Sequence, residues 1–298
     1  MRGARPIGST ALRVVRIALY LGFTGALMPV QAAGLALRRR WVERLPVFYH
    51  RVCCRILGFA VRTLGTPAGG VSTLYVANHV SYTDIAVLGS VLKASFIAKS
   101  EVAGWPLFGQ LAKLQRSIFI DRQARSAALQ LNAVAQRLAE GGALILFAEG
   151  TSGDGNRVLP FKTTLFAAAE MPTPAGAVAV QPVSVAYTRL DGIPIGRLYR
   201  PFFAWYGSMT LAPHLWTMLG LGVVEVVVEF HPATTLALCG SRKALAQYCR
   251  ARIAGGMAAA LTGRPQTTPL PPAGVRAEAI PGGGRMMRRP TNPQWRRT

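Results

Sequence analysis

The chain has 298 residues, of which 51% are hydrophobic and only 15% are charged, yet its formal net charge is +22. This length is enough to bury a full core, and an apolar, basic composition indicates an anionic partner, either a membrane surface or nucleic acid. The four cysteines have neither C-x-x-C spacing nor a zinc-binding pattern. This argues against a disulfide or zinc scaffold and predicts reduced thiols, as on the cytoplasmic side of a membrane.

An almost wholly apolar run occupies residues 14–37, and its length is close to the roughly 20 residues that cross a bilayer. Arg16 lies near one end and is expected to reach the headgroup layer, and the basic residues 38–40 predict a cytoplasmic flank. The run is too long for a cleaved signal peptide. A membrane-inserted helix is the favoured interpretation. A purely interfacial helix is the alternative, and the length of the run decides against it. Pro29 and Gln31 interrupt the run, which is typical of a kinked or re-entrant segment.

Residues 41–63 are aromatic, apolar and rich in arginine, with Arg51 and Arg55 on one face of a predicted helix. This composition is typical of a helix in the headgroup layer, and a packing helix with a solvated basic face is the alternative. The turn-rich segment 65–70 then separates this part from a globular domain. We therefore expect membrane anchor and interfacial helices over 1–64, a globular domain over 65–262, and a basic, Pro/Gly/Arg-rich disordered tail over 263–298.

Strand-like apolar runs alternate with helical segments in the globular domain. The predicted strands are residues 74–77, 94–98, 117–120, 143–147, 178–185 and 223–230. The predicted helices are residues 82–92, 105–114, 126–140 and 241–261. This alternation predicts an α/β fold with a mixed, largely parallel sheet flanked by helices and preceded by N-terminal membrane-associated helices.

The first predicted strand leads into His79, and Asp84 follows one helical turn later. A carboxylate at that spacing is expected to hold one imidazole nitrogen and to leave the other as a base that faces the crevice at the strand ends. Ser81 is predicted to be the N-cap of the next helix. The local pattern leaves an alternative open, because Ser81 and Asp84 also have the spacing of a capping box.

Two further strand ends carry polar groups. Arg122 follows the third predicted strand, and Glu149, Gly150 and Thr151 follow the fourth. Because the carboxyl ends of parallel strands share one edge, we expect these groups near His79. A guanidinium suits a phosphate or carboxylate, and free amides on a glycine turn suit a phosphate or an oxyanion. The set fits the deprotonation of a hydroxyl on an anionic lipid.

Four motifs occur in order: N-H-x-x-x-x-D at 78–84, I-F-I-D-R at 118–122, F-x-E-G-T at 147–151, and an apolar strand with a proline, V-Q-P-V, at 180–183. In these motifs the sequence resembles the glycerolipid acyltransferases, which are the 1-acylglycerol-3-phosphate (lysophosphatidate) acyltransferases. The resemblance covers roughly residues 70–235, and the N-terminal helices also fit it.

The resemblance implies a membrane-bound O-acyltransferase that uses acyl-CoA or acyl-carrier protein as donor and a lyso-lipid as acceptor, without a metal or bound cofactor. It implies His79 as general base and Asp84 as the group that holds its tautomer, with backbone amides stabilising the oxyanion. Ser81 as a nucleophile is a chemical alternative that lacks a G-x-S-x-G elbow. The family also implies the cell inner membrane, an anionic surface, with the catalytic domain on its cytoplasmic face.

The resemblance implies further roles in substrate binding. Arg122 and the turn of Glu149, Gly150 and Thr151 would bind the polar head of the acceptor, and Pro182 would shape the acyl-donor side.

The third motif departs from the usual F-P-E-G-T-R, because Ala148 and Ser152 replace its proline and its arginine. Arg157 or Lys162 would have to supply the missing guanidinium or ammonium group. Residues 149–162, 186–192, 205–207 and 211–216 resemble a bacterial branch that includes the lyso-ornithine lipid acyltransferases. The expected acceptor is therefore 1-acylglycerol-3-phosphate, which would give phosphatidate, with lyso-ornithine lipid as the alternative.

Two other classes compete with this interpretation. A nucleic-acid binder is disfavoured because the sequence has no helix-turn-helix or zinc-finger pattern, so no nucleic-acid partner is expected. A lipid hydrolase would release free fatty acid without an acceptor. His50, His214 and His231 have no carboxylate at a matching spacing and are interpreted as structural or interfacial.

Overall fold

The structure is a computed structural model, and it describes residues 8–69, 72–120, 127–173 and 176–264. The strands are β1 (Phe59–Leu64), β2 (Thr73–Ala77), β3 (Ser95–Lys99), β4 (Ile118–Ile120), β5 (Ala143–Phe147), β6 (Pro172–Thr173), β7 (Gly176–Ala177), β8 (Ala179–Leu190), β9 (Ile193–Pro194) and β10 (Val224–Phe230). The α-helices are α1 (Thr10–Ala36), α2 (Leu45–Leu57), α3 (Asp84–Val91), α4 (Phe108–Leu114), α5 (Ala127–Ala139), α6 (Leu211–Leu219), α7 (Leu236–Cys239) and α8 (Arg242–Thr262). The 3-10 helices within these described ranges are η1 (Arg40–Glu43), η2 (Ser100–Gly104), η4 (Thr163–Glu170) and η5 (Arg200–Phe202).

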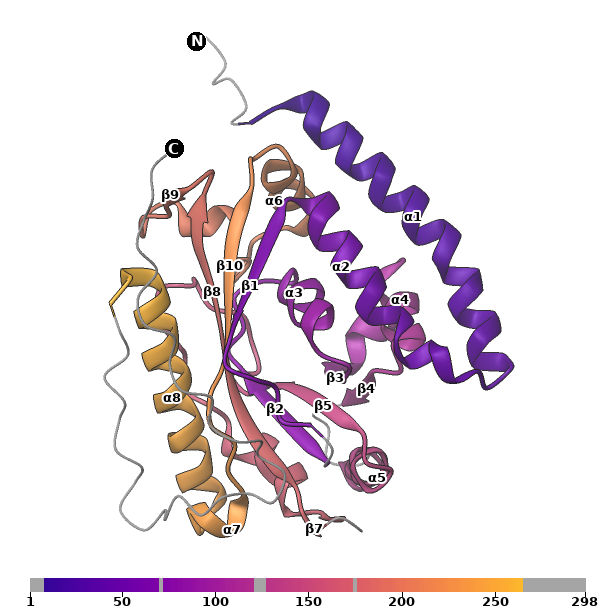
Figure 1. Ribbon diagram of the computed structural model, residues 1–298, viewed down its shortest axis with the longest axis vertical. Helices are drawn as coiled ribbons and strands as arrows, with labels where there is room; N and C mark the ends of the chain where they lie inside the picture. The colour runs from indigo at the N-terminus through magenta and orange to yellow at the C-terminus, as the bar shows by residue number, and fades with distance from the viewer. Residues whose placement is uncertain (1–7, 70–71, 121–126, 174–175, 265–298) are drawn as a thin grey trace, which may run out of the picture.

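The central sheet has the strand order β1-β10-β8-β2-β5-β3-β4, with β9 paired to β8 (Figure 1). Strands β8, β2, β5, β3 and β4 run parallel to one another. Strand β10 is antiparallel to β8, and β1 is parallel to β10. The prediction of a mixed, largely parallel sheet flanked by helices is therefore confirmed.

Each predicted strand is present, and β5 has the predicted bounds because a short apolar run between polar turns defines it. The strand predicted over 178–185 is longer and continues to Leu190 as β8. It continues because β10 pairs with it on one side along its second half, from Val183 to Leu190. An apolar run in the sequence therefore underestimates the length of a strand whose later residues are held by pairing with a neighbouring strand.

The helix predicted over 41–63 is wrong in its second part. Helix α2 ends at Leu57, because Gly58 adopts a left-handed φ of 84° and its N–H caps the last turn. The chain then forms β1, in which Phe59 lies opposite Val224 of β10. Strand β1 therefore belongs to the central sheet although it precedes residue 65.

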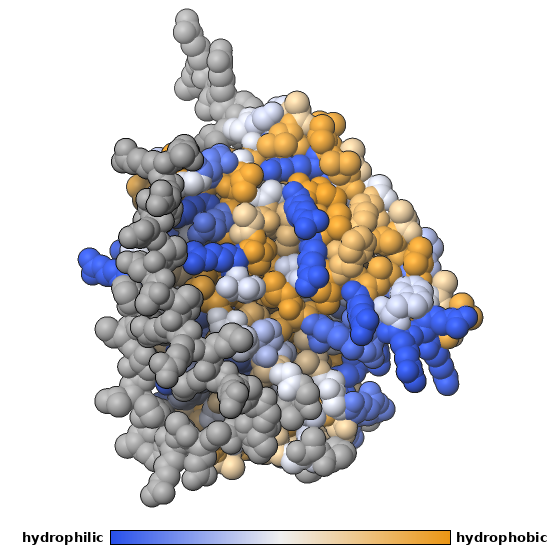
Figure 2. Space-filling view, viewed as in Figure 1, coloured by the Kyte–Doolittle hydropathy of each residue, from blue (hydrophilic) through white to orange (hydrophobic). Residues whose placement is uncertain are grey.

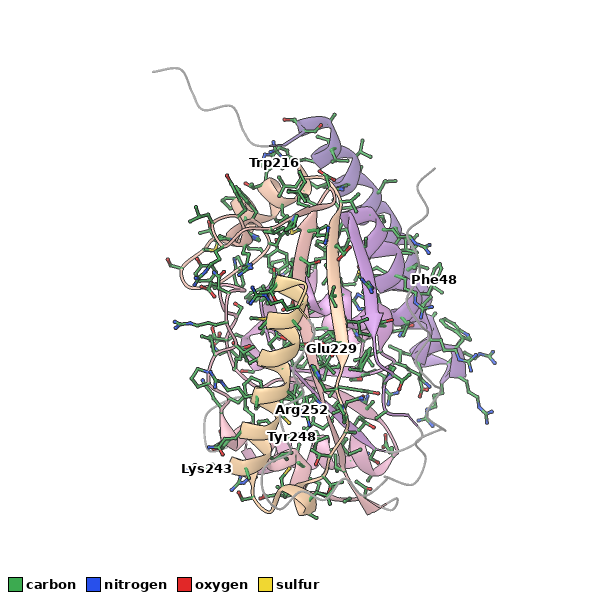
Figure 3. The ribbon with its side chains drawn as sticks, turned by 60° about the vertical axis from the view of Figure 1, so that its left-hand side comes forward. Phe48, Trp216, Glu229, Lys243, Tyr248 and Arg252 are labelled. Carbon is green, nitrogen blue, oxygen red and sulfur yellow. The ribbon has the colours of Figure 1, made fainter. Side chains whose placement is uncertain are left out.

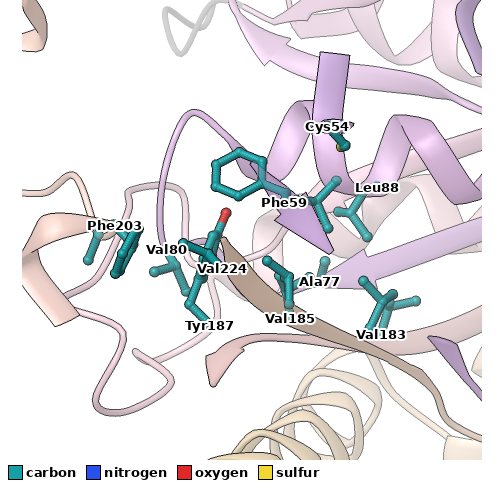
Figure 4. Close-up of a cluster of buried hydrophobic side chains, with 14 of the residues drawn as sticks. Cys54, Phe59, Ala77, Val80, Leu88, Val183, Val185, Tyr187, Phe203 and Val224 are labelled. Atoms are coloured by element: carbon teal, nitrogen blue, oxygen red, sulfur yellow. The ribbon is translucent and has the colours of Figure 1, made fainter. Parts of the chain in front are cut away.

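Two hydrophobic clusters lie on the two faces of the sheet, because successive side chains of a strand point to opposite sides. On one face, Tyr75 and Ala77 of β2 belong to a cluster that includes residues of α2, α3 and α6, part of which Figure 4 shows. On the other face, Leu74 and Val76 join residues of α5 and α8. Figure 1 shows α8 on one side of the sheet and α1, α2 and α3 on the other.

Helix α1 lies along the outside of the domain and is fixed by polar side chains on its inner face. The buried ones are Arg13, Arg16, Thr24 and Gln31. The Arg16 guanidinium donates to the carbonyl oxygens of Leu219 at 3.0 Å and Leu221 at 2.7 Å, so it binds the protein and does not reach for a headgroup layer. Near the other end, Gln31 donates to the carbonyl oxygen of Leu114 at 3.1 Å. Both ends of α1 are therefore bonded to the domain.

The outer face of α1 is apolar and uncovered, and Figure 2 shows hydrophobic surface over the region of α1 and α2 in Figure 1. Large exposed side chains on this helix are Val14, Val15, Leu19, Leu21 and Val30. By length and composition, α1 is able to cross a membrane. Its inner face is meanwhile bonded to the domain near both ends, through Arg16 and Gln31.

Candidate active site

His79 lies on the loop that leaves β2, and its imidazole is held on two sides. The ring stacks on Phe147 of β5, with 4.0 Å between ring centroids and an interplanar angle of 18°. Its Nδ1 lies 2.8 Å from Oδ2 of Asp84. No group of the described residues forms a hydrogen bond to Nε2, and the side chain is 20% exposed. The arrangement leaves Nε2 open to a substrate.

Asp84 is fully buried and is held by four donors. Its Oδ2 accepts from His79 Nδ1 and from the backbone N–H groups of Val80 at 2.7 Å and Ser81 at 2.9 Å. Its Oδ1 accepts from the hydroxyl of Tyr187 at 2.8 Å. A buried carboxylate with this many donors is fixed in one orientation, so it fixes the imidazole as well.

Ser81 does not cap the following helix, which corrects the sequence-based expectation. Helix α3 begins at Asp84, its N-cap is Thr83, and no side chain forms a cap hydrogen bond there. The Ser81 hydroxyl is completely buried. Asp84 instead binds the imidazole and the loop amides. Of the two interpretations of this spacing, the structure therefore has the His–Asp pair and not the capping box.

Asn78, the first residue of the motif, fastens the loop to β8. Its Nδ2 donates to the carbonyl oxygen of Val185 at 3.0 Å, and its Oδ1 accepts from the N–H of Val185 at 2.8 Å. This two-way bond copies the backbone pairing of a strand just beyond the end of β2. It sets where His79 leaves the sheet.

Glu149 lies under the His79 loop and does not face open space. It is 3% exposed, and its carboxylate accepts from the backbone N–H groups of His79 at 3.0 Å and Leu159 at 3.1 Å. Burial raises the pKa of Glu149 from 4.5 to about 7. These contacts suit a group that positions the loop better than one that binds an acceptor head.

The remaining predicted site residues lie in different environments. Gly150 has a left-handed φ of 69° and donates its N–H to the carbonyl oxygen of Phe147, and Thr151 is exposed. Pro182 is paired with Val76 inside the sheet and is not among the described residues that line the neighbouring cavity. Arg122 lies outside the described residues.

Three backbone amides of the His79 loop are already occupied. The N–H of His79 donates to Glu149, and those of Val80 and Ser81 donate to Asp84. The N–H of Gly153 donates to the carbonyl oxygen of His79 at 2.8 Å. These four N–H groups already donate to protein acceptors, so in this arrangement none of them is available to stabilise the oxyanion that the resemblance predicts.

A cavity of about 470 Å³ opens beside His79 and extends between α1, α2, α3, α4 and α6. Its lining is mainly apolar and aromatic, for example Phe96, Leu111, Trp205 and Leu215. Sequence reasoning did not find it, because its walls come from five helices that are distant in the chain. Of these four, Trp205 and Leu215 lay in segments that the resemblance had singled out.

Ser152 and the basic residues after it determine which charged groups are available to bind the head of the acceptor. The Ser152 hydroxyl donates to the carbonyl oxygen of Trp205, so this position, where the family often has an arginine, is tied into the loop. Arg157 and Lys162, the two expected substitutes, are exposed. Arg200 donates to Asn156, which in turn is bonded to Asp154, in the same group of loops.

The other three histidines are buried and have partners. His50 bonds Gln115 at 2.8 Å, and His214 bonds the Tyr82 hydroxyl at 3.1 Å. His231 bonds the Ser184 hydroxyl at 3.1 Å. Burial lowers the pKa of His50 and of His231 to about 4. The interpretation of these histidines as structural fits all three sites.

One of these histidines does have a nearby carboxylate, contrary to expectation. His231 Nδ1 lies 3.8 Å from Glu229 Oε1, so Ser184, His231 and Glu229 have the composition of a serine-hydrolase triad. They lie beneath α8, where a Cβ atom on Gly256 would meet both Ser184 and His231 at 2.5 Å. Figure 3 shows Glu229 beside α8. Ser184 and His231 are nearly inaccessible, which argues against a second reaction centre.

The raised pKa of Glu149 predicts a pH-dependent contribution to stability. A carboxyl whose folded pKa exceeds its unfolded value favours folding at low pH, and this contribution is lost as the pH rises through about 7. Between about pH 5 and pH 8 the wild type should lose about 2 kcal/mol more unfolding free energy than Glu149→Gln, measured by urea unfolding. Glu101→Gln, an exposed control, should match the wild type. Equal pH slopes for Glu149→Gln and wild type would contradict the assignment.

Residues 63–186 match the sequence profile of a family described as Acyltransferase. A lyso-ornithine lipid O-acyltransferase of Brucella abortus is 44% identical over 262 residues, which covers 87% of this chain and 98% of that protein. A protein of the same name from Rhizobium meliloti is also 44% identical, over 80% of this chain and 83% of its own length.

More distant relatives are named for the other candidate acceptor, 1-acyl-sn-glycerol-3-phosphate. A 1-acyl-sn-glycerol-3-phosphate acyltransferase of Neisseria gonorrhoeae is 34% identical over 53% of this chain and 58% of that protein. The crystal structure of the 1-acyl-sn-glycerophosphate (LPA) acyltransferase from Thermotoga maritima matches with a TM-score of 0.63 at 19% identity, over 87% of this chain and 97% of that one, so the fold is shared. The chain belongs to the acyltransferase family that includes the lyso-ornithine lipid O-acyltransferases and the 1-acyl-sn-glycerol-3-phosphate acyltransferases.

Proposed function

We propose that this acyltransferase moves a fatty acyl group from an acyl thioester to the free hydroxyl of a lyso-ornithine lipid. The observation that carries the proposal is the His79–Asp84 pair, with a 2.8 Å contact, beside an apolar cavity of about 470 Å³. The pair supplies a base for a hydroxyl, and the cavity suits the chain of a fatty acyl group.

The mechanism is a direct transfer. His79 Nε2 takes the proton of the acceptor hydroxyl as its oxygen attacks the thioester carbonyl, and a tetrahedral intermediate forms. The carbon–sulfur bond then breaks, and the leaving thiolate takes the proton back from Nε2. Asp84 keeps the proton on Nδ1 throughout and stabilises the imidazolium that forms between the two steps.

The acceptor is proposed from the relatives and from one position in the loop. The sequence motifs placed 1-acylglycerol-3-phosphate first, whereas the two relatives that are 44% identical, over 87% and 80% of this chain, are named for lyso-ornithine lipid. Ser152 supports that acceptor, because a hydroxyl bonded to Trp205 offers no positive charge to a phosphomonoester. 1-Acylglycerol-3-phosphate is the second candidate, and the more distant relatives favour it.

Transfer is distinguished from hydrolysis by the fate of the acyl group. Purified protein in mixed vesicles would be given an acyl-CoA or an acyl-carrier protein, with and without lyso-ornithine lipid. We expect ester product that requires the acceptor, and little free fatty acid. Release of fatty acid at the same rate without acceptor would support a hydrolase and refute the proposal. Acyl-CoA and acyl-carrier protein both carry the acyl group as a thioester, so each donor is tested in a separate arm of the assay.

The membrane arrangement is part of the proposal. The apolar outer face of α1 would lie in one leaflet, while Arg16 and Gln31 keep its inner face bonded to the domain. Arg38–Arg40, which follow α1, would meet anionic headgroups. With its free thiols, the domain would then lie on the cytoplasmic face of the inner membrane.

Charges on the outer face of α1 should release the protein from membranes. Val15→Glu combined with Leu19→Glu changes two half-exposed side chains one helical turn apart. Since a buried aliphatic side chain is worth about 1.5–3 kcal/mol, binding to vesicles of anionic and zwitterionic phospholipid should fall at least about tenfold in a flotation assay. Ala251→Glu with Ala258→Glu, on the exposed side of α8, is the matched control and should leave flotation unchanged. Equal flotation of both double variants would contradict the arrangement.

A further inference from the structure

Tyr187 reaches the predicted catalytic pair from the middle of the protein. It lies near the end of β8, on the same face of the sheet as Val183 and Val185, and is 4% exposed. Its ring stacks on Phe203 at 6.2 Å and meets Phe59 edge-on at 6.1 Å. Figure 4 shows it inside this buried cluster. The two rings leave the Tyr187 side chain little freedom to turn.

The direction of each hydrogen bond at the Tyr187 hydroxyl follows from chemistry. Ionised Asp84 can only accept, so Tyr187 donates to its Oδ1 at 2.8 Å. The hydroxyl of Thr83, 2.7 Å away, must then donate to Tyr187. Burial and the neighbouring Asp84 raise the pKa of Tyr187 far above its ordinary value, so it remains a donor at any working pH. The chain of bonds runs from Thr83 through Tyr187 to Asp84, which His79 meets from the other side.

We propose that Tyr187 is a positioning residue for acyl transfer, which holds the Asp84 carboxylate so that Oδ2 faces His79. The three donors all meet Oδ2, so by themselves they leave Oδ1 without a partner and leave the plane of the carboxylate free to tilt about Oδ2. A donor on Oδ1 removes that freedom and satisfies the second oxygen of a fully buried charge. This inference rests on the proposed role of His79 and Asp84.

The test uses Tyr187→Phe, which keeps the ring and removes only the hydroxyl. We expect kcat to fall about tenfold with little change in either KM, because the substrates do not touch this side chain. Tyr75→Phe is a matched control, since Tyr75 is also 4% exposed, lies in the same cluster and donates to the backbone oxygen of Ala68. It should lose a similar hydrogen bond and keep the wild-type kcat.

A double-mutant cycle separates positioning from packing. In an Asp84→Ala background, Tyr187→Phe has no carboxylate to position, so its effect on kcat should shrink to less than about twofold. A tenfold loss in both backgrounds would assign Tyr187 to packing and overturn the proposal, as would wild-type kcat for Tyr187→Phe. If Tyr187→Phe fails to fold, Thr83→Val weakens the same chain of bonds one step further out and should lower kcat by a smaller factor.

Failure of this inference is distinct from failure of the proposed function. If His79→Ala is inactive while Tyr187→Phe equals the wild type, only the positioning role is refuted. If His79→Ala retains transfer, the proposed mechanism itself is refuted.

Discussion

His79→Ala should reduce acyl transfer by at least about 10³-fold while the protein still folds and binds membranes, because the variant loses the base that takes the hydroxyl proton. The side chain is 20% exposed at the edge of a cavity, so its removal leaves the core intact. The measurement is the rate of ester formation at saturating donor and acceptor. A thermal melt and a vesicle flotation assay check the fold and the membrane binding.

Ser184→Ala is the matched control for this experiment. It removes the hydroxyl of the group formed by Ser184, His231 and Glu229, beneath α8 on the opposite face of the sheet. We expect its transfer rate to stay within about twofold of the wild type. Retained transfer in His79→Ala together with its loss in Ser184→Ala would move the reaction to the other face.

Asp84→Asn should lower kcat on the order of 10²- to 10³-fold, through loss of the negative charge that stabilises the imidazolium. The amide has the shape of the carboxylate, and its oxygen can still accept from His79, Val80 and Ser81. Its amino group would then face Tyr187, whose hydroxyl can turn to accept. The variant therefore separates charge from orientation, and the acceptor KM should change little.

Asp191→Asn serves as the control for a lost carboxylate. Asp191 is exposed and accepts from the N–H of Val223 at 2.7 Å, away from the His79 loop. Its kcat should remain within about twofold of the wild type. Full activity in Asp84→Asn would show that His79 needs no charged partner and would contradict the assigned role.

The sequence predicted the parts of the fold that short patterns define. Strand β5 is a five-residue apolar run between polar turns, and its bounds were predicted without error. Strand β1 was missed because residues 59–64 continue the apolar, arginine-rich pattern of α2. Only the left-handed Gly58 and the pairing with β10, which is more than 150 residues away, divide the two elements. A pairing of that separation leaves no local signal.

The candidate site divides in the same way. His79 and Asp84 could be predicted because they are five residues apart and one loop brings them together. The position of Glu149 at the end of a strand was predicted. The inward orientation of its carboxylate was not, since its burial depends on the loop that carries Leu159. Tyr187 lay in segment 186–192, which the resemblance had singled out, but its role was not predicted, because a tyrosine in a strand is ordinary core until Asp84 is placed beside it. The role proposed for Pro182 as a donor contact stays a prediction.

The central claim is tested most directly by competition between the two acceptors. Purified protein in vesicles would receive one labelled acyl thioester with equal amounts of lyso-ornithine lipid and 1-acylglycerol-3-phosphate, and mass spectrometry would measure both ester products. We expect ornithine lipid to form with a kcat/KM at least about tenfold that of phosphatidate, and neither product to form with His79→Ala. A tenfold preference for 1-acylglycerol-3-phosphate, or ester formation by the variant, would contradict the account.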